Sequence, residues 1–312
     1  MPKVSVIMNC YNGEKYLREA IDSIYAQTFH DWEIVFFDNA STDKSAAIAR
    51  SYDSRLKYIW NEELIVLGKA RKEALLKATG DWIAFLDTDD KWYPHKLETQ
   101  LNALSNTDYI ACYAGVRQIT PDGKKIRDSY PKHHTGNVLG GLLLQFDVNM
   151  VTPMFHRKIA IQYGISFDPV ITASEEYNLF MRLAAKGIFL VQNDLLGEYR
   201  VSIGSLTDQQ ISKWGFERNY TLDKLELENP GVTNRYLVEF AEARARGNYY
   251  DAQYMVSEGK FTEAKGIMRA IKGQDYRYKV LYYLLHVPYL WNFMHSKVFR
   301  SKITSLIKAD SL

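Results

Sequence analysis

The segment Trp82-Ile83-Ala84-Phe85-Leu86-Asp87-Thr88-Asp89-Asp90 joins five apolar residues directly to a cluster of three carboxylates. A short apolar run bounded by polar residues indicates a buried β-strand. Residues 4–8, 33–37 and 56–60 form similar runs, and apolar residues recur at helical spacing between them. Strands that alternate with helices predict an α/β fold, with a mainly parallel sheet flanked by helices.

Polar residues follow three of the four predicted strands at the point where each strand ends. They are Asn9, Tyr11 and Asn12 after the first strand, Asp38 and Asn39 after the second, and Asp87, Thr88, Asp89 and Asp90 after the fourth. In an open parallel sheet, ligands bind beyond the carboxyl ends of the strands. One acidic strand end is more often a helix cap, but three polar strand ends at one edge favour a binding site.

The three carboxylates within residues 87–90 repel one another unless a positive charge lies between them. Oxygen ligands suit hard cations such as Mg2+ or Mn2+, and Mg2+ usually binds through one or two carboxylates and the phosphates of a substrate. We therefore expect a divalent cation and a nucleotide diphosphate, with the cation acting as a Lewis acid toward the departing diphosphate. The alternative is a solvated acidic turn.

Other nucleotide and metal sites fit the sequence poorly. No Gly-x-Gly-x-x-Gly follows the first strand and there is no Gly-x-x-x-x-Gly-Lys-Ser/Thr loop, which disfavours dinucleotide and P-loop sites. No Cys/His spacing indicates zinc. The net charge of +2 gives no reason to expect a nucleic-acid partner. The two cysteines, Cys10 and Cys112, are expected to be reduced thiols of a cytosolic protein.

Five stretches of the chain resemble motifs of the family 2 glycosyltransferases. They are residues 4–17, 20–29, 38–43, 70–81 and 86–90, the last of which matches the family's Asp-x-Asp motif. The resemblance covers about residues 3–105 and thins to isolated motifs as far as about residue 207. It implies a Rossmann-like GT-A fold and the transfer of a sugar from an α-linked nucleotide sugar with inversion.

The resemblance also implies roles for individual residues. Tyr11 would stack on the nucleotide base, Asp38 would bond the edge of the base, and Arg71 would approach the nucleotide or its phosphates. Asp87 would hold the ribose or the sugar, and Asp89 would hold the cation, Mn2+ or Mg2+. Further contacts to the nucleotide sugar are expected from Asn9, Asn12, Glu14 and Thr88. The alternatives are a packed rim aromatic for Tyr11 and a helix-surface ion pair for Arg71.

An inverting transfer needs a base that takes the proton of the acceptor hydroxyl as it attacks. The family places this base in a Glu-Asp pair at the start of a helix, and the matching residues here are Glu175 and Glu176. Ser174 is expected to cap this helix, whose N-terminus favours an ionised carboxylate. Glu176 stands where Asp is usual, so the choice between Glu176 and Glu175 is open, and both could instead only occupy the first helical turn.

A late motif of the family often has His at the position of Ser202, after Tyr199-Arg200-Val201. Serine is a poor substitute for His as a metal ligand. We therefore expect the cation to rest on Asp89 and the phosphates alone.

The pattern predicts three parts: residues 1–105 as the nucleotide-sugar-binding half of the GT-A domain, 106–207 as its acceptor-binding half, and 208–312 as a C-terminal helical region. Residues 280–296 contain no Asp, Glu, Lys or Arg, and six basic residues but one acidic residue occur from Tyr276 onward. This suits a peripheral helix on anionic lipid. A buried helix or a dimer contact is the alternative.

We therefore expect an inverting glycosyltransferase at the cytoplasmic face of the membrane, with a UDP-sugar donor and a glycan or lipid-linked acceptor in polysaccharide assembly. The acceptor class rests on family analogy. The apolar start of the chain is too short for a signal peptide. A nucleotidyltransferase is disfavoured because no glycine-rich, basic loop follows the first strand. A non-catalytic sugar-nucleotide-binding protein is the other alternative, and the oligomeric state stays open.

Overall fold

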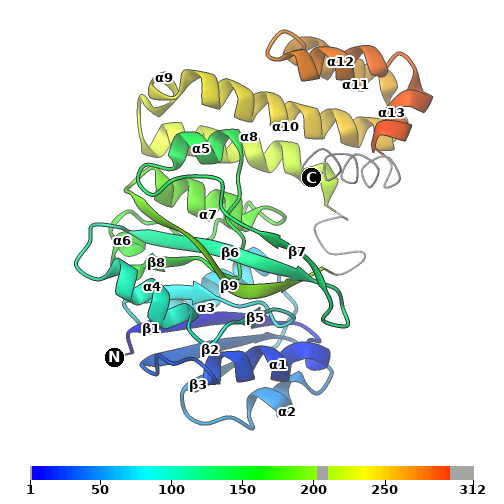
Figure 1. The fold of residues 1–312 in the computed structure, drawn as a ribbon. Helices are drawn as coiled ribbons and strands as arrows, with labels where there is room; N and C mark the ends of the chain where they lie inside the picture. The colour runs from blue at the N-terminus through cyan, green and yellow to red at the C-terminus, as the bar shows by residue number, and fades with distance from the viewer. Residues whose placement is uncertain (1, 202–209, 296–312) are drawn as a thin grey trace, which may run out of the picture.

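The structure is a computed structural model, which describes residues 2–201 and 210–295. Within these residues, one nine-stranded sheet has the order β3-β2-β1-β4-β8-β6-β9-β5, with β7 paired to β6 (Figure 1). The strands are β1 (Val4–Cys10), β2 (Trp32–Asn39), β3 (Leu56–Asn61), β4 (Trp82–Phe85), β5 (Lys91–Trp92), β6 (Ala111–Ile119), β7 (Lys125–Ser129), β8 (Met154–His156) and β9 (Phe189–Arg200). The helices are α1 (Glu14–Tyr25), α2 (Ser45–Ala49), α3 (Leu67–Leu76), α4 (Lys96–Leu104), α5 (Leu139–Leu144), α6 (Arg157–Gln162), α7 (Glu175–Ala184), α8 (Ile211–Glu228), α9 (Val232–Arg235), α10 (Leu237–Ser257), α11 (Phe261–Ile271), α12 (Tyr276–Leu284) and α13 (Pro288–His295).

The strands β3, β2, β1 and β4 are parallel, so their carboxyl ends lie along one edge of the sheet as the sequence predicts. Alternate residues of β1 face opposite sides of the sheet. Val4 and Val6 share a core cluster with the buried face of α1, whereas Ile7 belongs to the cluster that contains Ala70 and Ala74 of α3. Both faces of these strands are therefore covered, which explains their nearly continuous apolar sequences.

The second half of the sheet is mixed rather than parallel. Strand β8 runs antiparallel to both β4 and β6, and β5 runs antiparallel to β9, while β6 and β9 are parallel. The predicted α/β fold with a mainly parallel sheet is confirmed, and short antiparallel pairings add to it in the second half of the sheet. The two cysteines, Cys10 and Cys112, are buried free thiols.

The helices α8 and α10 pack into the same hydrophobic core as the sheet. Leu222, Leu225 and Phe240 belong to the cluster that contains Phe155 of β8 and Phe180 of α7. The core therefore runs across residue 207, where the sequence places a boundary between the acceptor-binding half and the C-terminal region. That division into three parts stays a prediction.

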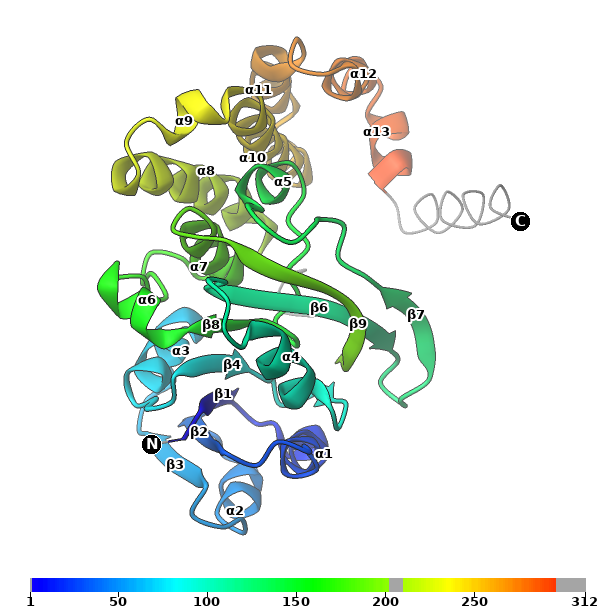
Figure 2. The same cartoon turned by 60° about the vertical axis from the view of Figure 1, so that its left-hand side comes forward.

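The helices α11, α12 and α13 form a separate cluster with the second half of α10. They lie beyond α8 and α10, away from the strands (Figures 1 and 2). Met268, Tyr282 and Trp291 are buried in this cluster. Other apolar side chains of α12 and α13 are exposed, and they include Tyr276, Val280, Tyr283, Tyr289 and Leu290. No helix in the described part of the chain has the length and apolar character needed to cross a membrane.

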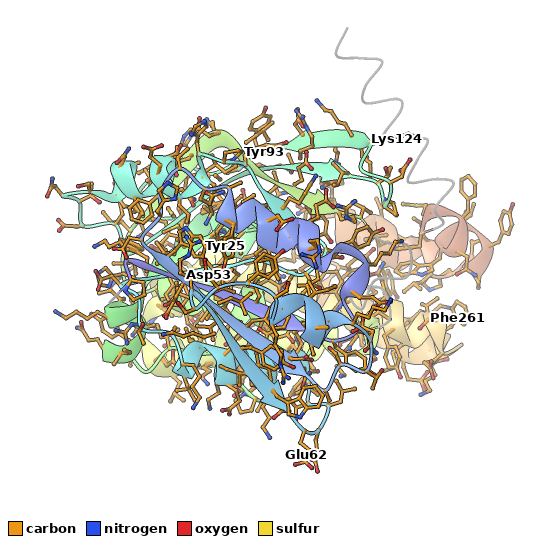
Figure 3. The ribbon with its side chains drawn as sticks, turned by 90° about the horizontal axis from the view of Figure 1, so that it is seen from below. Tyr25, Asp53, Glu62, Tyr93, Lys124 and Phe261 are labelled. Carbon is orange, nitrogen blue, oxygen red and sulfur yellow. The ribbon has the colours of Figure 1, made fainter. Side chains whose placement is uncertain are left out.

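The end of α1 is held against the segment before β3 by polar and ring contacts. Tyr25 and Asp53 lie side by side (Figure 3), and the Tyr25 hydroxyl donates to Asp53 Oδ1 at 2.9 Å. The Arg55 guanidinium covers the rings of Tyr25 and Trp32, at 4.6 and 4.4 Å from their centroids. Phe261, at the start of α11, is labelled at the right-hand edge of the same view.

Candidate active site

The loops after β1 and β2 are joined to each other by side-chain and backbone hydrogen bonds. Asn12 Oδ1 accepts from the Thr42 backbone N–H at 2.8 Å, and Glu14 Oε2 accepts from the Lys44 backbone N–H at 2.9 Å. Asn12 and Ala40 have φ values of 52° and 63°, the left-handed conformation that non-glycine residues rarely adopt. The structure thus uses Asn12 and Glu14, both predicted to contact the nucleotide sugar, to hold these loops in a fixed shape.

Asp38 is enclosed, with 0% of its surface exposed. Its Oδ1 accepts from the Ser41 backbone N–H at 2.9 Å, and its Oδ2 accepts from the Tyr58 hydroxyl at 2.7 Å. Burial and then Asp38 itself raise the pKa of Tyr58 to about 12, so this hydroxyl stays a donor. A contact between Asp38 and a nucleotide base therefore requires a rearrangement of the residues that enclose this carboxylate.

Tyr11 and Asn9 are the least constrained polar groups of the first strand end. Tyr11 exposes 52% of its surface, which does not fit the alternative of a packed rim aromatic. The Asn9 Nδ2 group is buried and has no hydrogen-bond partner among the described residues. The Tyr11 ring is therefore open to a ligand at this edge, and the Asn9 amide is a buried donor without a partner in the described chain.

Thr88 packs against the loop after β1. A Cβ atom at Gly13 would lie 2.9 Å from Thr88 Oγ1 and 3.0 Å from Cys10 Sγ. Only glycine fits at position 13 without moving these side chains. The close approach brings the loop after β4 against the loop after β1, as expected for two neighbouring parallel strands.

Arg71 of α3 neutralises the first carboxylate of the acidic cluster. Its Nη2 group lies 2.9 and 3.2 Å from the two carboxylate oxygens of Asp87. Arg71 is only 5% exposed, so it is not the helix-surface charge of the alternative interpretation. Burial alone would lower the pKa of Arg71, but Asp87, Glu175 and Glu176 outweigh burial and raise it. Arg71 is therefore a fixed positive charge between Asp87 and the start of α7.

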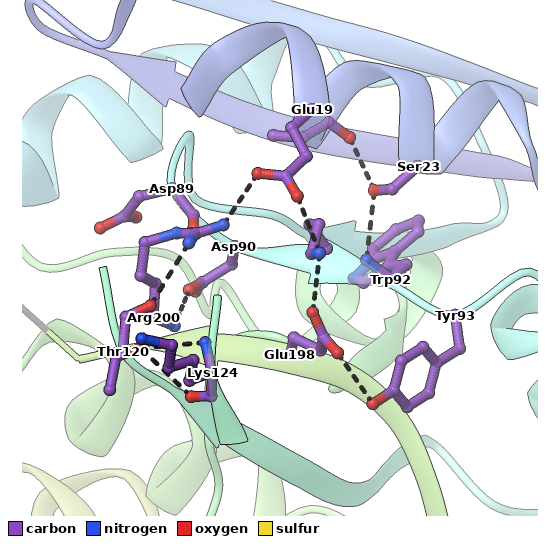
Figure 4. A network of polar contacts seen from close by, with 12 residues as sticks. Glu19, Ser23, Asp89, Asp90, Trp92, Tyr93, Thr120, Lys124, Glu198 and Arg200 are labelled. Atoms are coloured by element: carbon purple, nitrogen blue, oxygen red, sulfur yellow. Dashed lines mark hydrogen bonds and ion pairs between the residues drawn. The ribbon is translucent and has the colours of Figure 1, made fainter. Parts of the chain in front are cut away.

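Arg200 at the end of β9 fixes the backbone of the Asp89-Asp90 turn (Figure 4). Its backbone N–H donates to Asp90 Oδ1 at 2.8 Å, its Nε donates to the Asp89 carbonyl at 2.8 Å, and its Nη2 bonds Glu19 at 2.8 Å. Burial, and then the charges of Asp89 and Asp87, raise the pKa of Asp90. Asp90 thus belongs to this buried network and does not face the edge of the sheet.

The Asp89 carboxylate has no Lys or Arg partner among the described residues. Burial, and then the Asp87 charge, raise the pKa of Asp89 to about 6. A bound cation would lower the pKa of Asp89. No three His, Cys, Asp or Glu residues of the described chain form a metal-binding group. Ser202, predicted not to act as a ligand, lies outside the described residues.

The start of α7 is held in place by a carboxylate from α8. Glu217 Oε1 accepts from the backbone N–H of Thr172 at 2.7 Å, and its Oε2 accepts from the backbone N–H of Ala173 and the hydroxyl of Ser174 at 3.1 and 2.7 Å. Ser174 occupies the predicted cap position but makes no capping hydrogen bond. Its hydroxyl donates to Glu217 instead, so the position of the predicted cap is confirmed but the predicted capping hydrogen bond is wrong.

Glu175 and Glu176 have different surroundings. Glu175 is 4% exposed, packs against Gly68 of α3, and has an Oε1 atom without a partner in the described structure. Glu176 is partly exposed. Burial, and then the Glu175 charge, raise the pKa of Glu176 to about 7 against the lowering effect of Arg71. Glu176 is therefore the more accessible of the two candidate bases.

A cavity of about 260 Å3, the helical cavity, opens beside Glu176 between α7, α8 and α10. Its lining includes Glu176, Tyr177, Trp214, Arg218, Arg246 and Tyr250. A second cavity of about 390 Å3 lies against β6 and β7 and shares Phe146 with the first. The residues of α8 and α10 are not among the predicted site residues, because no family motif covers these two helices. The available signal was an aromatic residue and an arginine four positions apart on each helix, which places them on one helical face.

The arrangement of the described residues is that of a nucleotide-sugar-dependent transferase: three strand ends converge on one edge, and a carboxylate pair faces it from the start of α7. The family model "Glycosyl transferase family 2" matches residues 5–164. The chain belongs to this family and is a glycosyltransferase.

Two relatives show where the similarity extends. The putative teichuronic acid biosynthesis glycosyltransferase TuaG of Bacillus subtilis is 30% identical over 217 residues, which cover 68% of this chain and 83% of TuaG. The Escherichia coli enzyme WfgD is 26% identical over 251 residues, which cover 80% of this chain and 96% of WfgD. WfgD is described as a UDP-Glc:alpha-D-GlcNAc-diphosphoundecaprenol beta-1,3-glucosyltransferase.

Two solved structures share the fold. S. aureus TarS 1-349 in complex with UDP-GlcNAc superposes with a TM-score of 0.65 at 17% identity, covering 97% of this chain and 92% of that one. The mannosyltransferase PcManGT of Pyrobaculum calidifontis, in complex with GDP-Man and Mn2+, has a TM-score of 0.63 at 17% identity, covering 97% of this chain and 83% of that one. The predicted GT-A fold is thereby confirmed.

Proposed function

We propose that this glycosyltransferase moves a sugar from a nucleotide diphosphate sugar, most simply a UDP-sugar, to a hydroxyl of a glycan or lipid-linked acceptor, with inversion. The observation that carries the proposal is the position of Glu176. This carboxylate lies within electrostatic reach of Arg71 and Asp87 at the strand edge and also lines the helical cavity. It therefore stands between a site for the donor and a site for the acceptor.

On the donor side, Tyr11 offers an exposed ring for stacking on the base, and Asn9 offers a buried amide group whose Nδ2 has no hydrogen-bond partner in the described chain. Arg71 holds Asp87 so that its carboxylate can accept hydrogen bonds from the ribose or the sugar. Asp89 would hold Mn2+ or Mg2+, as the Mn2+ complex of PcManGT suggests for this fold. When bound, the cation supplies positive charge that stabilises the departing diphosphate.

On the acceptor side, Glu176 acts as the base. The acceptor oxygen forms a bond to the anomeric carbon, while the bond from that carbon to the diphosphate oxygen breaks. The acceptor proton moves to the Glu176 carboxylate, and the nucleoside diphosphate leaves with the bonding electron pair. Glu176 must be ionised for this step, and Arg71 favours its ionised form.

The acceptor class is proposed from the relatives. WfgD acts on a sugar linked through diphosphate to undecaprenol, and TuaG is assigned to teichuronic acid biosynthesis. A lipid-linked or polysaccharide acceptor in cell-surface glycan assembly agrees with both. Work on such an acceptor would place the protein at the cytoplasmic face of the membrane.

A thermal-shift screen of UDP-, GDP- and other nucleotide sugars, with Mn2+ or with chelator, tests the donor and the metal. A ligand at 100 times its Kd stabilises the native state by about 2.7 kcal/mol, or roughly 5 °C for a protein of this size. We expect this rise only with metal, and we expect Asp89→Asn to abolish it. Asp81→Asn is the matched control, because Asp81 is an exposed carboxylate at the other end of β4 that pairs with Lys3.

Two outcomes would contradict the proposal. If no nucleotide sugar stabilises the protein, the donor class is wrong. If stabilisation is undiminished with chelator present or in Asp89→Asn, the metal assignment is wrong while the transferase assignment stands.

A further inference from the structure

The helical cavity contains a buried positive charge that the described structure leaves incompletely paired. Arg218 is 8% exposed, and its Nη2 group has no hydrogen-bond partner among the described residues. Its Nε donates to the Ala243 carbonyl at 3.2 Å, and its guanidinium carbon lies 4.5 Å from the centroid of the Tyr177 ring. No carboxylate of the described chain pairs with it. Because a guanidinium stays charged, burial without an anionic partner is costly.

A second arginine lines the same cavity from the neighbouring helix. Arg246 of α10 donates through Nη2 to Glu242 Oε1 at 3.0 Å. The same oxygen also accepts from Arg277 Nη2 at 3.1 Å and from the Tyr278 hydroxyl at 3.0 Å. Glu242 is therefore shared among three donors and only partly neutralises Arg246. The charge of the cavity lining thus consists of two arginines and the single carboxylate of Glu176.

Aromatic rings complete the lining. Trp214 and Tyr250 are in edge-to-face contact with ring centroids 5.5 Å apart, and Phe146 and Tyr177 are in edge-to-face contact at 5.2 Å. Trp214 and Arg218 lie four residues apart on α8, as do Arg246 and Tyr250 on α10, so each helix presents one ring and one guanidinium. A pocket with apolar walls and a few convergent charged groups is typical of a small-molecule site.

The geometry points to an acceptor subsite in the helical cavity for a sugar that carries an oxyanion, a phosphate or a carboxylate, near the hydroxyl that is glycosylated. This inference rests on the proposed function, because Glu176 defines which hydroxyl reacts. With that hydroxyl at Glu176, the ring of the acceptor sugar lies against Trp214 and Tyr250. Its oxyanion accepts hydrogen bonds from Arg218 and Arg246, which are strong because both partners are charged.

The selectivity of the subsite follows from the same contacts. A neutral acceptor can offer the Arg218 Nη2 group only an uncharged oxygen, whereas an oxyanion both accepts its hydrogen bond and compensates its buried charge. The volume of about 260 Å3 suits one sugar with its attached charged group rather than an oligosaccharide. The second cavity beyond Phe146 does not include Glu176 in its lining, so it is not the reacting position.

The test measures release of the nucleoside diphosphate with three acceptor probes. They are an alkyl-diphosphate-linked N-acetylglucosamine, an alkyl disaccharide that ends in glucuronic acid, and a neutral alkyl N-acetylglucosaminide. The variants are Arg218→Gln and Arg246→Gln. The matched control is Arg244→Gln, because Arg244 is an exposed arginine of α10 that pairs with Asp223 and does not line the cavity.

We expect the wild-type enzyme to prefer at least one anionic probe over the neutral probe. In Arg218→Gln and in Arg246→Gln, the KM for that probe should rise by about 10- to 100-fold, the loss expected for a hydrogen bond between charged groups. The kcat and the KM for the donor should stay unchanged, the KM for the neutral probe should rise much less than that for the anionic probe, and Arg244→Gln should behave as wild type. The diphosphate and uronate arms identify which oxyanion the subsite takes.

Several outcomes would overturn the inference. They are equal use of neutral and anionic probes, variants that impair all three probes alike, and failure of both anionic probes to bind the UDP-loaded enzyme by calorimetry. If Arg218→Gln fails to fold, Arg246→Gln decides the question by itself. Hydrolysis of the donor in the absence of an acceptor distinguishes a failure of the proposed function from a failure of the subsite alone. If no nucleotide sugar is hydrolysed or bound, the proposed function is wrong, whereas normal hydrolysis without charge preference removes only the subsite.

Discussion

The strand edge and the helical cavity, which meet at Glu176, differ in how their polar groups are satisfied. At the strand edge, most polar groups are paired: Asn12, Glu14, Asp38 and Asp87 all accept hydrogen bonds from neighbouring loops or side chains, and Asn9 Nδ2 is the exception in the described chain. In the helical cavity and at the start of α7, several buried polar atoms have no partner in the described chain. They are Glu175 Oε1, Tyr177 OH and Arg218 Nη2.

This difference indicates two kinds of preorganisation. The strand edge is rigid before a ligand arrives, because short loops bonded to each other fix its shape. The helical cavity carries polar groups whose burial is costly until a ligand supplies their partners. We therefore expect the donor site to be insensitive to changes in α8 and α10, and the acceptor site to depend on them.

The largest expected effect is that of Glu176→Gln, which should lower turnover without changing the binding of the donor. Loss of a general base lowers kcat by about 10^2- to 10^4-fold, whereas binding of the nucleotide sugar should change little because no donor contact is removed. Turnover measured at saturating donor, with calorimetry for donor binding, gives both numbers. Normal turnover in Glu176→Gln combined with an inactive Glu175→Gln would move the base to Glu175.

The pH dependence of kcat/KM should reflect the same carboxylate. The pKa of Glu176 is raised to about 7, so below that pH the group is increasingly protonated and cannot accept a proton. We expect kcat/KM to rise about tenfold per pH unit up to about 7 and then to level off. Glu176→Gln should lose this slope. A wild-type profile that is flat between pH 5.5 and 7.5 at saturating metal contradicts the assignment.

Glu217→Ala tests whether α8 positions the base. The substitution leaves the backbone N–H groups of Thr172 and Ala173 without their acceptor. We expect a loss of about 2–3 kcal/mol in the free energy of unfolding, together with a lower kcat and unchanged donor affinity. Glu226→Ala is the matched control on α8, since Glu226 also accepts two backbone N–H bonds, from Gly231 and Thr233, but does not touch α7. Equal effects of both variants on kcat would remove the positioning role.

The smallest effect concerns the outer face of α12 and α13, where the proposed membrane contact lies. Tyr283 and Tyr289 are 58% and 77% exposed. Basic residues near anionic lipid contribute about 1 kcal/mol each, so binding should weaken as salt rises. Sedimentation with anionic vesicles should retain the wild-type chain at low salt, and Tyr283→Ser/Tyr289→Ser should reduce retention more than Leu227→Ser, which changes an exposed apolar residue of α8. If the wild-type chain stays in the supernatant at low salt, this face contacts protein instead.

Much of the strand edge could be predicted because it depends on local sequence. The strands β1, β2, β3 and β4 appear within two residues of their predicted positions and are parallel, so polar residues at their ends had to meet at one edge. What the sequence could not give was the direction of each side chain. Asp38 is buried and accepts from the Tyr58 hydroxyl, and Asp90 joins the Arg200 network. The Ser174 hydroxyl donates to Glu217 and does not cap its own helix.

The sequence by itself determined the α/β class, the acidic cluster after β4 and the carboxylate pair at the start of α7, because strand and helix periods and strand-end motifs are encoded by neighbouring residues. Only the tertiary structure decided that Arg71 pairs with Asp87, that Glu176 rather than Glu175 is accessible, and that Arg218 and Arg246 line a cavity beside it. Those relations join residues far apart in the chain through the packing of α7, α8 and α10. The hydrophobic periodicity of each helix does not specify which faces of the three helices pack together. The polar contacts between these helices therefore depend on the packed core and cannot be predicted from the pattern of any one segment.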